Sequence, residues 1–74
     1  MAAPIHLVLR VRRHERDRQH VLLSRESDDP NADEDITAAR LLEIQSAMRS
    51  GAPRPIFSLT HERNGEPVEP QPAA

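Results

Sequence analysis

The chain is 74 residues long, carries a formal net charge of −2 and contains one aromatic residue, Phe57. This length limits it to one small domain, which we place at residues 1–70, with residues 71–74 as a disordered tail. Because cysteine is absent, a disulfide framework and a zinc site built on thiolates are excluded, and no cofactor is expected.

Charge is distributed in blocks along the chain. Residues 1–25 carry six arginines against two acids, residues 26–36 carry six acids, and the remainder is neutral. The chain as a whole therefore lacks the positive electrostatic field of a dedicated nucleic-acid binder, and only a local positive region is possible near the N-terminus. No apolar run approaches a membrane span, and the first residues lack the pattern of a secretory signal, so we expect a cytoplasmic protein.

Two stretches near the N-terminus alternate between apolar and polar residues. Residues 4–12 show the period-two pattern of a half-buried strand, and residues 19–25 repeat it. The arginine-rich segment between them, residues 13–18, contains neither glycine nor an apolar residue. We therefore expect an antiparallel hairpin with a turn of four or five residues.

A helix is predicted in the middle of the chain. Residues 26–35 are acidic and contain a proline, which indicates a solvated connection. Residues 36–50 are rich in helix formers and predict an α-helix with Asp35 as its N-cap. Gly51 suits the left-handed position that ends a helix, and the prolines after it prevent continuation.

The C-terminal part predicts a second hairpin. Residues 56–62 alternate, and Asn64-Gly65 is the strongest short turn signal in the chain, so a brief fourth strand at Glu66–Val68 is expected to fold back. The order strand, strand, helix, strand indicates the α+β class, with a small antiparallel or mixed sheet of three to four strands and one helix on one face. The pattern does not decide whether the third strand pairs with the first.

The predicted faces supply a small core. Its expected members are Ile5, Leu7, Leu9, Val11, Val21, Leu23, Ile36, Leu41, Ile44, Met48, Phe57 and Leu59. Three further apolar residues, Val8, Leu22 and Leu42, fall outside these faces and would lie in water in a one-layer arrangement. A partner or second chain would cover them, and the alternative is that isolated exposed apolar residues are ordinary.

The residue pattern gives little support to catalysis or metal binding, and we predict no catalytic and no metal-ligating residues. The acidic stretch before the helix fails as a calcium loop at its glycine and at its bidentate glutamate. His6 and His20 are expected to face each other on the hairpin, without the spacing of a known metal site. Acid–base work by His61 with Glu62 would need a pocket that so short a chain can hardly build.

The arginine-rich hairpin has the most functional content. The candidate partner-binding residues are five arginines of this hairpin and two apolar neighbours: Val8, Arg10, Arg12, Arg13, Arg16, Arg18 and Leu22. Three interpretations stay open: a protein-interaction surface, a phosphate-binding tip and a soluble hairpin end. The interleaved acids and the lack of a stacking aromatic residue disfavour nucleic acid.

These observations favour a small non-catalytic protein-interaction module, acting as a homodimer or in a complex, in the manner of modulators and inhibitors encoded by phages and mobile elements. The alternative is a nucleic-acid-binding protein that uses the arginine-rich hairpin. Neither a membrane partner nor a small-molecule substrate is indicated. The acidic residues 26–35 are expected to neutralise the arginines in part, either by lying across the hairpin of the same chain or by meeting it across a dimer.

Overall fold

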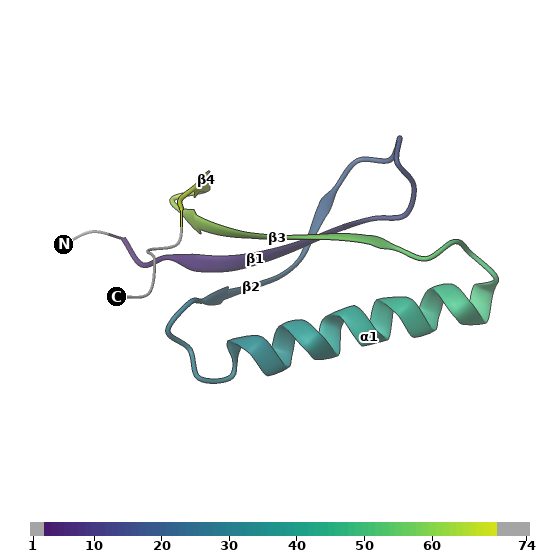
Figure 1. The fold of residues 1–74 in the computed structure, drawn as a ribbon, viewed down its shortest axis with the longest axis horizontal. Helices are drawn as coiled ribbons and strands as arrows, with labels where there is room; N and C mark the ends of the chain where they lie inside the picture. The colour runs from purple at the N-terminus through teal and green to yellow at the C-terminus, as the bar shows by residue number, and fades with distance from the viewer. Residues whose placement is uncertain (1–2, 70–74) are drawn as a thin grey trace.

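A computed structural model describes residues 3–69 as a four-stranded antiparallel sheet with one helix on one face (Figure 1). The elements in chain order are β1 (His6–Arg12), β2 (His20–Glu26), α1 (Ala32–Ser50), β3 (Ile56–Arg63) and β4 (Glu66–Pro67). The predicted α+β class and the order strand, strand, helix, strand are thereby confirmed. The predicted tail, residues 71–74, lies outside the described residues.

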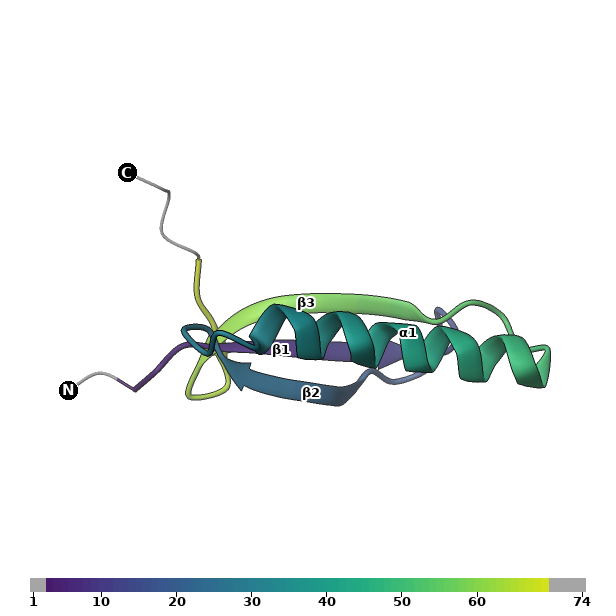
Figure 2. The same cartoon turned by 90° about the horizontal axis from the view of Figure 1, so that it is seen from below.

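The central strand of the sheet is β1, because the strand order is β2-β1-β3-β4. Leu9 lies opposite Leu23 of β2 and opposite Leu59 of β3, which decides the pairing that the sequence left open. Strand alternation sends Leu9 toward α1 and its neighbours Val8 and Arg10 to the opposite side. We call these sides the helix face and the back face, and Figure 2 shows α1 running along the helix face beneath β1.

A β-bulge in β2 changes where two of its apolar residues lie. Leu9 pairs with Leu23 whereas Arg10 pairs with Val21, so Leu22 is the extra residue of β2. Leu22 packs against the core, and the prediction that it lies opposite the core is wrong. Val21 was predicted to be buried but is 54% exposed, because the bulge resets the alternation.

The helix begins at Ala32, and its N-cap is Asn31 rather than the predicted Asp35. The Asp29 side chain accepts a hydrogen bond from the Asn31 backbone N–H at 2.8 Å, which turns the chain into the helix. The three acids that follow Ala32 lie in the first turn, where the positive end of the helix dipole favours negative charge. Part of the acidic stretch is therefore helix and not connection.

Both predicted turn positions are confirmed. Gly51 ends α1 in the left-handed conformation with a φ of 69°. Asn64 and Gly65 have φ angles of 53° and 80°, the pair of positive angles that a two-residue hairpin turn needs. Because β4 pairs only with Glu62–Arg63, the outer edge of β3 lacks a described strand partner along residues 56–61.

The core between sheet and helix is small. Its buried apolar residues are Leu7, Leu9, Val11, Ala32, Ile36 and Ala47, whereas Val8 is buried on the back face. Besides Val21, three residues predicted to be buried are exposed: Leu41 and Met48 of α1 are 53% and 75% exposed, and Leu59 of β3 is 41% exposed. One helix is too narrow to cover the whole face of the sheet.

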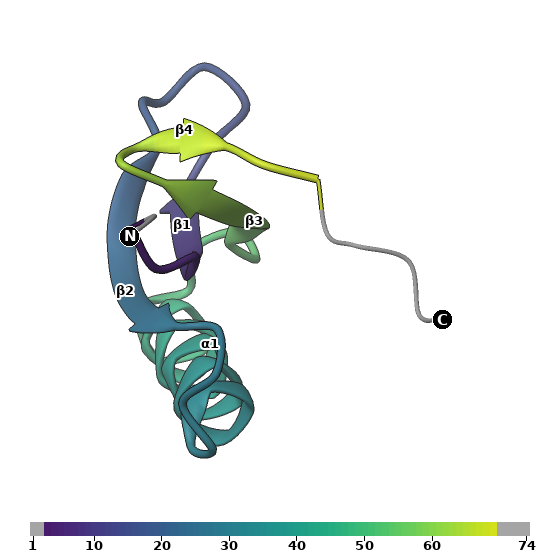
Figure 3. The same cartoon turned by 90° about the vertical axis from the view of Figure 1, so that its left-hand side faces the viewer.

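Seen end on, the sheet forms one layer with α1 on one side and the β3–β4 hairpin curling over the other (Figure 3). Within residues 3–69, no helix combines the length and the apolar character that crossing a membrane requires.

Leu9 is fully buried at the centre of the sheet. We predict that Leu9→Ala lowers the free energy of unfolding by about 2–5 kcal/mol, because it removes buried apolar surface and leaves a cavity. Urea denaturation followed by circular dichroism measures the loss. Leu42→Ala is the matched control, since Leu42 is 67% exposed, and it should change stability by about 0.5 kcal/mol or less. Equal losses in the two variants would contradict this placement of the core.

Candidate functional site

The predicted partner-binding arginines divide into residues that the fold holds and residues that it leaves in solvent. Arg12 is half-buried, and its Nη1 donates to the Glu15 carbonyl at 3.3 Å. Arg13 lies 3.9 Å from the Glu43 carboxylate of α1. Arg16 and Arg18 are exposed in the loop between β1 and β2. The predicted residues therefore do not form one continuous surface.

Arg10 belongs to a polar cluster on the back face. Its Nη1 and Nη2 donate to the two carboxylate oxygens of Glu62, the second at 3.2 Å, and Nη1 also contacts Thr60 Oγ1 at 3.1 Å. Thr60 in turn donates its hydroxyl to Glu62 at 2.5 Å. Glu62 is buried, so the pair is shielded from water and fastens β3 to β1. Sequence reasoning missed this cluster, because it depends on the pairing of β1 with β3.

The same contacts hold Glu62 in its charged form. Hydrogen bonds donated by Arg10 and then by Thr60 lower the pKa of Glu62 from 4.5 to about 2, and the hydrogen bond that Arg10 donates to Glu62 raises the pKa of Arg10. A carboxylate with so low a pKa is a weak proton acceptor near neutral pH. His61 lies on the helix face opposite Leu7, so it points away from Glu62 and the two cannot share a proton.

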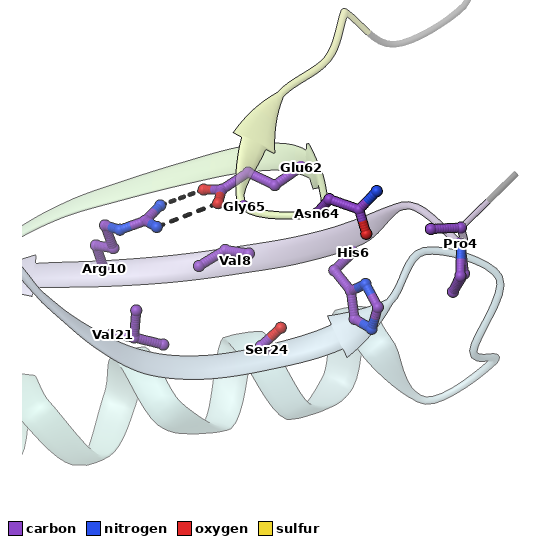
Figure 4. Close-up of a pocket in the computed structure, with 10 residues that line it drawn as sticks. Pro4, His6, Val8, Arg10, Val21, Ser24, Glu62, Asn64 and Gly65 are labelled. Carbon is purple, nitrogen blue, oxygen red and sulfur yellow. Dashed lines mark hydrogen bonds and ion pairs between the residues drawn. The ribbon is translucent and has the colours of Figure 1, made fainter.

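A hollow of about 400 Å³ lies on the back face beside this pair (Figure 4). β1, β2 and the β3–β4 turn line it, and Figure 4 shows Val8 between the ion pair and Val21. Val8 was predicted to be exposed but is buried here, since the turn and the ion pair cover it. Because Val8 is buried and the guanidinium of Arg10 is bound by Glu62, neither of these predicted residues is available to a partner.

The histidine pair predicted on the hairpin does not form. His6 pairs with Glu26 and Glu62 at one end of the sheet, whereas His20 pairs with Val11 at the other end and on the other face. Among residues 3–69, no group of three or more histidine or carboxylate side chains is arranged to hold a metal ion.

Exposed apolar side chains gather on one flank of the helix. Ile36 faces the sheet, and the ion pair of Asp35 with Arg25 at 3.1 Å places the Asp35 flank of α1 over β2. At 100° per residue, Leu41 and Met48 fall on the opposite flank, which lies on the β3 side. Leu59 projects from the helix face of β3. We call these three exposed residues, Leu41, Met48 and Leu59, the α1–β3 flank.

This flank adjoins the unpaired outer edge of β3. Along residues 56–60 the outward backbone N–H and C=O groups of that edge have no described strand partner, whereas the His61 carbonyl accepts a hydrogen bond from the Val68 N–H at 2.8 Å. The β2 edge differs, because the Arg25–Asp35 ion pair and the packing of Leu23 close its helix side. An apolar strip beside a free strand edge can bind a partner through main-chain hydrogen bonds and side-chain burial together.

Most arginines and most acids lie at opposite ends of the molecule, which measures 46 × 26 × 21 Å, although Glu15 and Asp17 lie between the loop arginines. The arginine pole consists of Arg12, Arg13, Arg16, Arg18, Arg49 and Arg54. The acidic pole consists of Glu26, Asp28, Asp29, Asp33, Glu34 and Asp35. The two poles are separated by the length of β2, roughly 20 Å at the usual rise per residue, and Figure 1 shows both ends. The acidic stretch contacts its own hairpin at Arg25, which pairs with Asp35, but it does not lie across the arginine-rich end as expected.

Comparison with protein-family models, curated proteins and solved structures found no match to this chain.

The Glu62 pair predicts a pH dependence of stability. Because folding lowers the pKa of Glu62 from 4.5 to about 2, its stabilisation is complete above pH about 4.5 and is lost as the pH falls toward 2. We expect Glu62→Gln to destabilise the protein at neutral pH and to match the parent near pH 2. Urea denaturation across this pH range measures the difference, with Glu66→Gln in the exposed β4 as the control. A deficit that stays constant with pH would contradict the assignment.

Proposed function

We propose that this chain is a non-catalytic protein-interaction module whose binding surface is the α1–β3 flank with the adjoining edge of β3. The observation that carries the proposal is the exposure of Leu41, Met48 and Leu59, at 53%, 75% and 41%, in a chain with so small a core. Leu41 and Met48 share one flank of α1, and exposed apolar side chains on a common face mark interaction sites more often than isolated ones do. Val8 and Leu22, which were predicted to bind a partner, are not part of this proposed surface.

Binding at this surface would combine two contributions. A partner strand beside β3 would satisfy the free outward backbone groups of residues 56–60, which gives affinity with little dependence on sequence. The apolar strip would give selectivity, because a partner must present apolar side chains on the same side. We propose a cytoplasmic location on the sequence alone, and modulation or inhibition of a larger macromolecule stays a prediction.

Several features of the back face support a non-catalytic role. The carboxylate with the strongest perturbation, Glu62, is held as an ion-pair partner and not as a base. His61, its neighbour in sequence, lies on the opposite face of the sheet. We infer that the Arg10–Glu62 pair serves the fold and that the chemistry of this protein is recognition.

Substitution of the strip tests the proposal. We expect Leu41→Gln with Met48→Gln to abolish capture of protein partners, or of the chain itself, from a lysate of the source cells onto the immobilised protein. Leu42→Gln is the matched control, because Leu42 is equally exposed on the other flank of α1 and should leave capture unchanged. Quantitative mass spectrometry of the bound fraction gives the readout, and identical bound fractions for both variants would contradict the proposal.

The arginine pole favours a second candidate function, the binding of a polyanion. Arg16 and Arg18 are exposed in the β1–β2 loop, and the end of α1, whose last turn contains Arg49, lies at the same end of the molecule (Figure 1). Such a cluster binds phosphates mainly through charge.

For this candidate, we expect Arg16→Ala with Arg18→Ala to weaken binding to a single-stranded oligonucleotide and to lower the salt slope by about 1 for each phosphate that is no longer neutralised. Asp17→Asn should strengthen binding, because it removes an acid from the loop. Fluorescence anisotropy over a salt series measures both effects. Binding that is absent or insensitive to salt would remove this candidate.

A further inference from the structure

We propose that the partner at the α1–β3 flank is a second copy of this chain, bound antiparallel along the edge of β3. The inference rests on the proposed function and names its partner. In this arrangement β3 pairs with β3 of the second copy, the two sheets become one, and the two α1 helices lie side by side on the same face. The flanks of the two copies, Leu41, Met48 and Leu59 in each, then bury one another.

The choice of β3 over β2 follows from what surrounds each edge. The helix side of β2 is closed by the 3.1 Å contact of Arg25 with Asp35 and by packing of Leu23 against the core. The helix side of β3 is open, and Leu59 is 41% exposed there. Ile56, at the start of the same strand, adds an exposed apolar side chain on the back face. β2 also has an exposed apolar side chain on the back face, Val21, but its helix side is closed, so the edge of β3 is the one with exposed apolar side chains on both faces.

The choice of a second copy follows from the separation of charge. A two-fold axis perpendicular to the sheet and through the edge of β3 reverses the long axis of the second molecule. The arginine pole of each copy then lies beside the acidic pole of the other, which a parallel arrangement would not allow. Within one copy the poles are separated by more than the Debye length of about 8 Å at physiological salt, so they do not neutralise each other.

The antiparallel arrangement also suits the helices and the strand edge. Asp33 and Glu34 lie in the first turn of α1, and Arg54 follows its end, so each acidic helix start faces the arginine that follows the partner's helix. The β4 strand covers β3 only at Glu62–Arg63, which leaves the middle of the edge free for a symmetric ladder. Because the contact is the same patch on both copies, the assembly closes at two.

The first test is the mass of the protein in solution as a function of concentration. Light scattering after size exclusion should show twice 8.3 kDa at high concentration, with dissociation on dilution. Leu41→Gln with Met48→Gln should raise the dimer dissociation constant at least about tenfold, because the substitutions remove apolar surface from the interface in both copies. Leu42→Gln should leave it unchanged. Circular dichroism confirms that each variant is folded.

Charge reversal tests the pairing of poles. Arg54→Glu alone and Asp33→Arg alone should each weaken self-association, since each places like charges together at both junctions. An equimolar mixture of the two variants should recover the parent affinity, because every junction then joins opposite charges. Failure of the mixture to recover would overturn the antiparallel contact of Asp33 with Arg54.

Orientation is measured directly with spin labels, which is convenient because the chain has no cysteine. Labels at Arg18→Cys and Asp28→Cys mark the two poles. In the antiparallel dimer the mixed pair, one label of each kind, should give a shorter electron–electron distance than either like pair. A shorter distance between like labels would overturn the antiparallel arrangement.

The outcomes separate this inference from the function on which it rests. A strict monomer whose flank still captures a different protein would overturn the second copy and leave the interaction module standing. A strict monomer with no flank-dependent capture would overturn both. A dimer whose dissociation constant is unchanged by the Leu41→Gln and Met48→Gln substitutions would show that the α1–β3 flank is not the interface.

Discussion

The packing of one helix over the central strand is the interaction on which the rest of this structure depends. A helix with its side chains is about 10 Å across and strands lie about 4.8 Å apart, so one helix covers roughly two strands. α1 covers β1 and is fastened to β2 by Arg25 and Asp35, which leaves the helix face of β3 open. The exposed strip of Leu41, Met48 and Leu59 is the direct consequence.

The back face of the sheet is stabilised differently, because no second layer covers it. The β3–β4 hairpin curls over this face, and the Arg10–Glu62 pair joins β1 to β3 beside the buried Val8. A buried ion pair is costly unless both partners are well bonded, and here Thr60 adds a further hydrogen bond. The back face is therefore closed by polar contacts, and the helix face carries the surface that is free to bind.

Local sequence patterns predicted the helix and the strands, whereas the residues of the candidate site depend on which strands pair with each other. The alternation of apolar and polar residues predicted the strands. Gly51 predicted the end of the helix and Asn64-Gly65 predicted the second hairpin turn, because each of these signals reflects a backbone conformation. The bulge at Leu22 could not be predicted from alternation, and it reversed the expected burial of Val21. Arg10 and Glu62 are 52 residues apart, so their contact depends on the order of strands. The exposure of Met48 depends on the position of the helix over the sheet.

The central claim is that the β3 edge, and not the β2 edge, is the binding surface. Amide hydrogen exchange measured over a range of protein concentrations tests it most directly, because each edge serves as the control for the other. We predict that the outward amides of residues 56–60 gain protection as the concentration rises, while those of residues 20–26 keep their exchange rates. Protection that appears at β2, or that appears equally at both edges, would contradict the account.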